Sequence, residues 1–346
     1  MRKHLFIGVD ALFITNPTNI RYLTGFVGVE DRDAYCLVTQ NQFYFFTSSL
    51  YLESAKKLRA KVLEISRENP IAKEIARLCE ELKIKKLGFE EANLTVAEYN
   101  KLKGLHLVPT NNRIEQLRMI KRADEIAHIR LAANLTDQCF KFITRRIRPG
   151  VTESRLALEI EGFLRSRGAD LAFSPIVAFN EHSFQPHYHE RSYDPLRRGS
   201  LILLDFGAKI NGYCADMTRV VFVGKPKDGW VRAYNTVLQA QNKALGLLRD
   251  GVRSGATLDA AAKEVIAEAN LPPYPHSLGH NVGLDVHEGP RLSVKKDEKL
   301  LPGMVFSVEP AVYIEGTYGI RIEDLVRLTD KGIEILSTSP KEMIIL

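Results

Sequence analysis

The chain has 346 residues, of which 45% are hydrophobic and 26% are charged, and its formal net charge is +6. This length predicts two domains, because domains typically span roughly 100–200 residues. No apolar run approaches the roughly 20 residues that cross a bilayer, and the basic start is not followed by the small-residue cleavage site of a signal peptide. We therefore expect a cytoplasmic protein with no membrane role.

Charge and cysteine usage argue against two further classes. Basic clusters such as Arg145-Arg-Ile-Arg148 are short and not interleaved with aromatic residues, so a solvated surface explains them better than nucleic-acid binding. The cysteines form no CxxC pair, so neither a zinc ribbon nor a disulfide framework is predicted. We expect buried thiols at Cys36, Cys79, Cys139 and Cys214.

The first part of the chain alternates predicted strands and helices. Asn16-Pro17 is interpreted as a turn that ends the first strand. The patterns predict strands at residues 11–15, 35–38, 43–46 and 87–89, the middle two as a hairpin, and helices at 50–58 and 71–82. This alternation predicts a small α/β domain, which we place at residues 1–112 because turn residues cluster before Arg113.

The second predicted domain spans residues 113–346 and has a different pattern. It opens with a helical stretch at 114–147, broken near Lys121-Arg122, and Thr152 caps a helix that runs to about Arg167. Further strands are expected at 176–179, 201–206 and 213–223, helices at 230–249 and 258–269, and a strand-rich end.

Two aspartates flank a predicted chain reversal. If the chain turns between Ile210 and Asn211, Asp205 and Asp216 face one another, with Cβ atoms roughly 4.5–5.5 Å apart. Two like charges at that separation are destabilising unless they share a proton or a cation. They would otherwise be unrelated surface residues, but Asp205 closes an aliphatic run, where burying an unpaired charge is costly.

Two glutamates repeat this arrangement near the end of the chain. A turn centred on Gly316 places Glu309 opposite Glu323, again within apolar strands. Four carboxylates and one imidazole are enough to hold two divalent cations, whose charges they offset. This donor set favours manganese or cobalt, with zinc as an alternative, and two such ions support hydrolysis by activating water and polarising a carbonyl.

Histidines concentrate in the same region. Gly279 and Gly283 lie beside His280 and allow close backbone approach to a ligand. A lone histidine is more often a surface or core residue, but here six of the nine lie in one part of the chain: His182, His187, His189, His276, His280 and His287.

Five ordered motifs resemble the pita-bread metallopeptidases, which include methionine aminopeptidase, Xaa-Pro aminopeptidase and Xaa-Pro dipeptidase (prolidase). The start of the first domain, Asn16-Pro-Thr-Asn-Ile-Arg-Tyr-Leu-Thr-Gly-Phe26, also resembles the proline-specific branch. The motifs of the second domain are Asp205-Phe-Gly-Ala, Asp216-Met-Thr-Arg, His276-Ser-Leu-Gly-His280 with Asp285-Val-His287-Glu-Gly-Pro, Ser307-Val-Glu309-Pro, and Gly319-Ile-Arg-Ile-Glu323-Asp.

The resemblance implies a role for each matching residue. Glu309 would also shuttle the proton from the attacking water to the leaving nitrogen, His287 would contact the substrate or oxyanion, and His187 would lie near the scissile amide. An extra histidine, His189, leaves open which of the two takes that last role. The implied metal ligands are Asp205, Asp216, His280, Glu309 and Glu323, with Asp216 and Glu323 bridging two ions.

The remaining implied residues face the substrate. His276 and Arg291 resemble positions that hold the prolyl end of a dipeptide, and Arg321 lines the same site. The alternative for either arginine is a salt bridge that orients Glu309 or Glu323.

The resemblance therefore implies an α+β pita-bread domain preceded by a smaller α/β domain, in a homodimeric Xaa-Pro dipeptidase. One alternative is an Xaa-Pro aminopeptidase acting on longer peptides. The other is a non-catalytic binding relative, which is disfavoured because all five ligand positions are occupied by ligating residue types.

Overall fold

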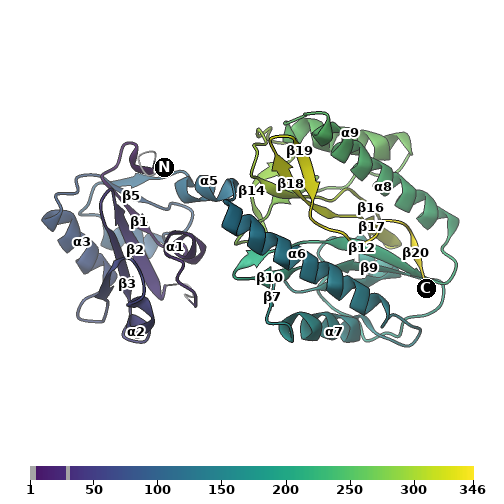
Figure 1. Ribbon diagram of the computed structural model, residues 1–346, viewed down its shortest axis with the longest axis horizontal. Coiled ribbons are helices and arrows are strands. Elements are labelled where there is room, and N and C mark those ends of the chain that lie inside the picture. Colours follow the sequence, from purple (N-terminus) through teal and green to yellow (C-terminus); the bar gives the residue numbers. More distant parts are fainter. Residues whose placement is uncertain (1–4, 29–31) are drawn as a thin grey trace. The chain divides into compact units, whose positions relative to one another are not determined.

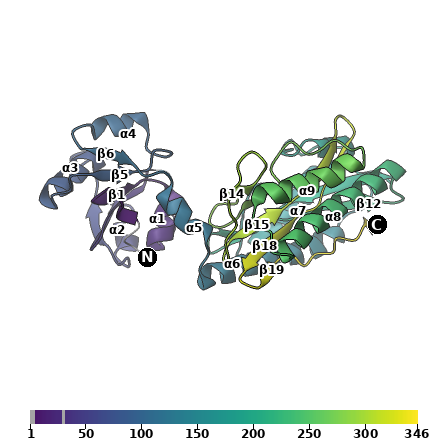
Figure 2. The same cartoon turned by 90° about the horizontal axis from the view of Figure 1, so that it is seen from above.

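A computed structural model describes residues 5–28 and 32–346 of the chain (Figures 1 and 2). The chain divides into two units, Met1–Arg118 and Met119–Leu346. The boundary expected at Asn112 precedes helix α5 (Arg113–Met119), whereas this division falls near the end of that helix.

The first unit is a six-stranded mixed sheet with helices on both faces. Across the sheet the strands are β4 (Lys61–Glu64), β3 (Phe43–Thr47), β2 (Ala34–Thr39), β1 (Ala11–Ile14), β5 (Leu87–Phe89) and β6 (Leu107–Pro109). Side chains alternate along β1: Leu12 packs with Ile20 and Ile114 on one face, and Phe13 packs with Ile75 on the other. The predicted α/β domain and its β2–β3 hairpin are confirmed.

The helices of this unit are α1 (Pro17–Thr24), α2 (Leu52–Ala55), α3 (Ile71–Glu81), α4 (Val96–Lys101) and α5. The interpretation of Asn16-Pro17 as a turn missed α1. The Asn16 side chain accepts hydrogen bonds from the backbone of Thr18 and Asn19, and Pro17 occupies the first helical position, which is a helix-start pattern. The helix predicted at 50–58 is only α2, because Ala55 alone is buried and gives a longer helix little apolar support.

The second unit consists of two halves in chain order, and each half begins with a pair of helices. They are α6 (Ala123–Thr144) with α7 (Glu153–Arg165), and α8 (Asp228–Arg249) with α9 (Gly255–Glu268) (Figure 1). The predicted break near Lys121-Arg122 and the Thr152 cap are confirmed. Trp230 of α8 stacks with Phe222 of β12, and Leu258 and Ala262 of α9 belong to the same buried core cluster.

The strands of this unit form two larger sheets and two small ones. The larger sheets run β20-β12-β9-β8 and β14-β13-β15-β18-β19, and the smaller ones run β11-β10-β7 and β16-β17. The first half supplies β7 (Asp170–Leu171), β8 (Ile176–Phe179), the 3₁₀ helix η2 (Asn180–Phe184), β9 (Ser200–Asp205), β10 (Ala208–Ile210), β11 (Tyr213–Cys214) and β12 (Thr218–Val223). The second half supplies β13 (Gly279–Asn281), β14 (Glu288–Leu292), β15 (Val305–Val308), β16 (Ala311–Ile314), β17 (Tyr318–Arg321), β18 (Asp324–Thr329), β19 (Gly332–Ile335) and β20 (Ile344–Ile345).

Two expectations about the whole chain can be compared with this fold. All four cysteines are free and buried, as predicted. Among residues 5–28 and 32–346, no helix is both long enough and apolar enough to cross a membrane.

Candidate metal centre and active site

The second carboxylate hairpin has the predicted register. Ala311 pairs with Arg321 in β16–β17, and Val308 pairs with Asp324 in β15–β18. The same register thus holds on both sides of a short interruption that contains Glu309 and Glu323. The two glutamates lie opposite one another, as the turn centred on Gly316 predicts.

The register predicted for the first hairpin is wrong by two residues. Asp205 pairs with Thr218 instead of Asp216, because the turn is centred between Asn211 and Gly212. Both turn residues have positive φ, as a two-residue hairpin turn requires. Asp216 remains on the face of Asp205 as its diagonal neighbour, which keeps the two carboxylates within reach of each other.

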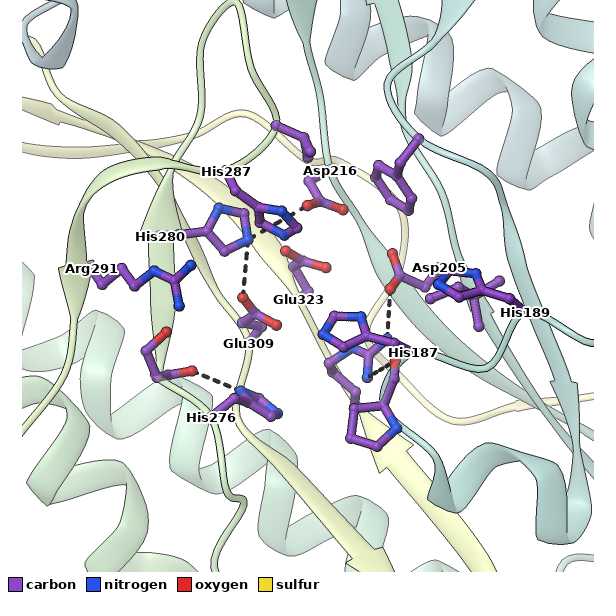
Figure 3. Close-up of a pocket in the computed structure, with 16 residues that line it drawn as sticks. His187, His189, Asp205, Asp216, His276, His280, His287, Arg291, Glu309 and Glu323 are labelled. Atoms are coloured by element: carbon purple, nitrogen blue, oxygen red, sulfur yellow. Dashed lines mark hydrogen bonds and ion pairs between the residues drawn. The ribbon is translucent and has the colours of Figure 1, made fainter. Parts of the chain in front are cut away.

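All the site residues predicted from the sequence line one cavity of about 470 Å³ in the second unit (Figure 3). Apolar side chains of Phe173, Ile176, Pro186 and Val286 contribute to its walls. The polar lining consists of His187, His189, Asp205, Asp216, His276, Ser277, His280, His287, Arg291, Glu309, Arg321 and Glu323. The structure brings these residues together, and their individual roles remain predictions.

Three of the predicted ligands form a compact group. Asp216, His280 and Glu323 are buried, and each offers a donor atom within 4.8 Å of the other two. Asp205 and Glu309 lie on opposite sides of this group (Figure 3). The structure therefore gathers all five predicted ligands in one part of the cavity.

Unsatisfied oxygens in this group fit a bound metal. Asp205 Oδ1, Asp216 Oδ1 and Glu323 Oε1 are buried and accept no hydrogen bond. Burial, followed by the charges of neighbouring carboxylates, raises the pKa of Asp216 and Glu323 well above the usual range. Buried oxygens without partners are costly, and divalent cations would satisfy both the oxygens and their charge.

His280 is oriented by its second ring nitrogen. Its Nδ1 lies 3.3 Å from the carbonyl oxygen of Asn281, and its Nε2 lies 3.3 Å from Glu309 Oε1 and 3.7 Å from Asp216 Oδ2. A proton on Nδ1 that is donated to this carbonyl leaves the Nε2 lone pair for a metal. Burial raises the pKa of Glu309, but the neighbouring His280 ring and the charges of His276 and Arg321 together outweigh it and lower that pKa to about 2.

Arg321 is held by other residues of the site. Its Nη2 donates to Asp205 Oδ2 at 2.6 Å, Nη1 to the Tyr313 hydroxyl at 2.6 Å, and Nε to Thr218 Oγ1 at 3.0 Å. The side chain is buried, so these contacts favour the alternative of an orienting salt bridge, formed here with Asp205. The partner predicted from the sequence, Glu309 or Glu323, was wrong, because the carboxylate within reach of the guanidinium is that of Asp205.

Two further residues were missed from the sequence. The Thr218 hydroxyl donates to Glu323 Oε2 at 2.7 Å, and the Tyr313 hydroxyl lies 3.2 Å from His276 Nε2. Thr218 lies two residues after Asp216, so the period of a strand places both on one face, which could have identified it. Tyr313 pairs with Gly319, two residues before Arg321, so Tyr313 and Arg321 lie diagonally on one face of β16–β17. This relation appears only once the register of the two strands is known.

The remaining histidines and Arg291 line the open part of the cavity. Figure 3 shows His187 near the middle of the labelled residues and His189 beside Asp205 at their edge. The ring of His287 lies 4.4 Å from that of His280, and partial desolvation followed by the His280 charge lowers the pKa of His287 to about 4. Arg291 lies opposite His280 across β13–β14 and is exposed.

Comparison with known families identifies the class of this site. Residues 127–330 match metallopeptidase family M24, and residues 7–120 match the creatinase/prolidase N-terminal domain. The chain belongs to metallopeptidase family M24, and this membership makes it a peptidase with the pita-bread fold.

Individual relatives resemble the chain over nearly its full length. The uncharacterized peptidase YqhT of Bacillus subtilis is 38% identical over 99% of this chain and 98% of its own. The Xaa-Pro dipeptidase from Bacillus anthracis superposes with a TM-score of 0.92 at 36% identity, covering 99% and 98% of the two chains. The X-Pro aminopeptidase from Thermotoga maritima superposes with a TM-score of 0.88 at 34% identity, covering 98% of each chain.

Proposed function

We propose that this peptidase uses two divalent metal ions to hydrolyse the bond before proline, preferentially in Xaa-Pro dipeptides. The observation that carries the proposal is the pair of hairpins whose buried carboxylates leave three oxygens without hydrogen-bond partners around His280. Similarity to the Xaa-Pro dipeptidase from Bacillus anthracis and the prolidase from Pyrococcus furiosus supports the substrate class.

The donor set divides into two groups that share their central members. Asp205 would help to hold one ion, His280 and Glu309 would help to hold the other, and Asp216 and Glu323 would be shared by both. The oxygen-rich donors favour manganese or cobalt, with zinc as the alternative. When bound, such ions lower the pKa of water and polarise the scissile carbonyl.

The protein residues then bind the substrate and move protons. Glu309 is ionised and accepts the proton of the attacking water, which it passes to the prolyl nitrogen. His187 lies beside the scissile amide in preference to His189, because it lies nearer the middle of the site residues (Figure 3). His287 is neutral near pH 7 and contacts the developing oxyanion.

The prolyl carboxylate is bound by Arg291 and His276. The exposed guanidinium of Arg291 offers a planar fork of donors, which suits a free carboxylate. Arg321 lines the cavity, but its donors contact Asp205, Tyr313 and Thr218, so it orients other site residues instead of binding the substrate.

We expect the active species to be a homodimer in the cytoplasm. Size-exclusion chromatography with light scattering tests the homodimer.

Two substrates test this proposal. We expect manganese- or cobalt-loaded protein to cleave Ala-Pro with a higher kcat/KM than Ala-Pro-Ala, because Arg291 and His276 recognise the prolyl carboxylate. Arg291→Ala should raise the KM for Ala-Pro about ten-fold or more, the size of a hydrogen bond to a charged group. Arg291→Lys keeps the charge without the fork and should show a smaller rise.

The outcomes separate the alternatives. A preference for Ala-Pro-Ala contradicts the dipeptidase and supports an Xaa-Pro aminopeptidase, which the similarity to the Thermotoga maritima structure also favours. Unchanged Ala-Pro kinetics in Arg291→Ala contradict its carboxylate-binding role. No hydrolysis with manganese, cobalt or zinc would support a non-catalytic binding protein.

A further inference from the structure

Two histidine-bearing loops border the cavity, and each is attached to a helix by a buried carboxylate. The His187 loop comprises residues 179–192, and the His276 loop comprises residues 274–278. The carboxylates are Glu153 at the start of α7 and Asp259 in α9, and both are fully buried. Neither lines the cavity or belongs to the set of predicted ligands.

Glu153 contacts the His187 loop at four points. Its Oε1 accepts from the Phe179 backbone N–H at 2.6 Å and lies 2.8 Å from His182 Nδ1. Its Oε2 accepts from the Tyr188 hydroxyl at 2.9 Å and from the Ser192 backbone N–H at 2.7 Å. One side chain thus fixes both ends and the middle of the loop.

Tyr188 connects this carboxylate to His187. The tyrosine is buried and its ring stacks on that of His182, with centroids 4.8 Å apart. The hydroxyl bond to Glu153 and the stacking on His182 hold the Tyr188 side chain from two directions, and His187 is the residue directly before it. Burial and the Glu153 hydrogen bond raise the pKa of Tyr188, so the hydroxyl stays protonated as the donor.

Asp259 contacts the His276 loop through Tyr274 and makes two further hydrogen bonds outside that loop. Its Oδ1 accepts from the Tyr274 hydroxyl at 2.9 Å, and its Oδ2 accepts from the Val294 backbone N–H at 3.0 Å and from Lys263 at 2.9 Å. The Tyr274 ring packs on the His276 ring with centroids 5.0 Å apart, and Lys263 also donates to the His276 carbonyl at 3.4 Å.

We propose that Glu153 and Asp259 are positioning residues that set two different steps of the reaction through Tyr188 and Tyr274. Glu153 fixes His187 beside the scissile amide and therefore controls kcat. Asp259 fixes His276 at the prolyl carboxylate and therefore controls KM. This assignment rests on the proposed function for the roles of the two histidines, whereas the attachment of the loops rests on the contacts alone.

Removing one hydroxyl at a time tests the proposal without breaking either carboxylate's other bonds. We expect Tyr188→Phe to lower kcat for Ala-Pro about ten-fold with little change in KM, as for loss of a supporting hydrogen bond. Tyr274→Phe should raise KM about ten-fold with little change in kcat. Tyr213→Phe is the matched control, because its hydroxyl donates to the buried Glu125 at the same 2.9 Å.

Hydrogen exchange measured by mass spectrometry supplies a readout that does not depend on activity. Tyr188→Phe should speed exchange in the His187 loop only, and Tyr274→Phe in the His276 loop only, with metal content equal to that of the wild type. Tyr213→Phe should leave both loops unchanged.

Two results would overturn the proposal: the same kinetic parameter changing in both variants, or exchange in neither loop responding. If the wild-type protein cleaves neither Ala-Pro nor Ala-Pro-Ala, the proposed function is wrong instead. The exchange comparison then decides alone whether the two carboxylates hold these loops.

Discussion

The two carboxylate hairpins of the second unit look alike in sequence but pair differently. The hairpin of Glu309 and Glu323 has three residues, 315–317, between the paired Ile314 and Tyr318, so its centre is Gly316. The hairpin of Asp205 and Asp216 has two, Asn211 and Gly212, between the paired Ile210 and Tyr213. The turn centre predicted for the aspartate hairpin was one residue too early. Each residue of that hairpin was therefore assigned a partner two residues away from the observed one.

The error nevertheless leaves the metal site intact. Side chains alternate between the two faces of a strand, so a shift of two residues keeps Asp216 on the face of Asp205, whereas a shift of one would have put it on the other face. The face that a residue occupies is therefore a more robust inference than its partner. The buried oxygens of Asp205, Asp216 and Glu323 that lack a hydrogen-bond partner are consistent with these carboxylates facing one site.

The largest expected effect comes from removing the central carboxylate of each hairpin. Asp216→Ala and Glu323→Ala should each lower activity more than about a hundred-fold, because loss of even an outer partner of a metal ligand can reach that size. Both should bind less than the wild-type amount of metal, measured by elemental mass spectrometry. If only one loses metal, the two hairpins do not contribute equally and the shared-ligand arrangement is wrong.

A smaller effect should follow from a methyl group added to a tightly packed glycine in each hairpin. A Cβ at Gly207 would lie 1.8 Å from the Ala215 carbonyl oxygen, and one at Gly319 would lie 2.0 Å from that of Ser183. We expect Gly207→Ala and Gly319→Ala to cost about 1–3 kcal/mol each, the usual range for overpacking. Thermal unfolding followed by circular dichroism measures this loss.

The two glycine variants should differ in activity. Gly207→Ala displaces the backbone beside Asp216 and should weaken metal binding, whereas Gly319→Ala displaces Ser183 and should lower kcat through the His187 loop. Gly316→Ala is the control for the fold, because a Cβ there meets no atom within 4 Å and only the positive φ of 63° is unfavourable. Equal metal affinity in all three variants would contradict the link between Gly207 and Asp216.

The sequence could predict most of the site because its residues carry local signals. Asp205 closes an apolar strand, Gly316 marks a turn, and His280 lies between glycines, so spacing and residue type indicate their surroundings. The α/β class of the first domain follows from the alternating periodicities, whereas the pita-bread fold of the second was implied by the resemblance of its motifs. Helix α1 was missed although Asn16 and Pro17 form a capping pattern, because the same dipeptide also signals a turn.

The supporting contacts lie beyond such reasoning. Glu153 and Tyr188 are 35 residues apart, and Arg321 and Asp205 are 116 apart. Their contacts depend on how helices and sheets pack, and the local pattern of Glu153 is that of any acidic residue in the first turn of a helix. Predicting these contacts requires the three-dimensional packing of helices on sheets, which the local signals indicate only in outline.

The smallest effect concerns Thr218, which joins the two hairpins. It pairs with Asp205 in the first hairpin, and its hydroxyl donates to Glu323 of the second while accepting from Arg321. Thr218→Val keeps the shape and suits a strand but leaves a second oxygen of Glu323 without a partner. We expect metal affinity, measured by calorimetric titration, to fall about ten-fold.

Thr236→Val is the matched control, because this buried threonine donates only to a carbonyl of its own helix, that of Arg232 at 3.0 Å. The corrected register is what makes Thr218 informative: a residue opposite Asp205 that also bonds Glu323 must lie where the two hairpins meet. If Thr218→Val and Thr236→Val bind metal equally, the two hairpins are supported independently, and the bond between them contributes to folding rather than to the metal centre.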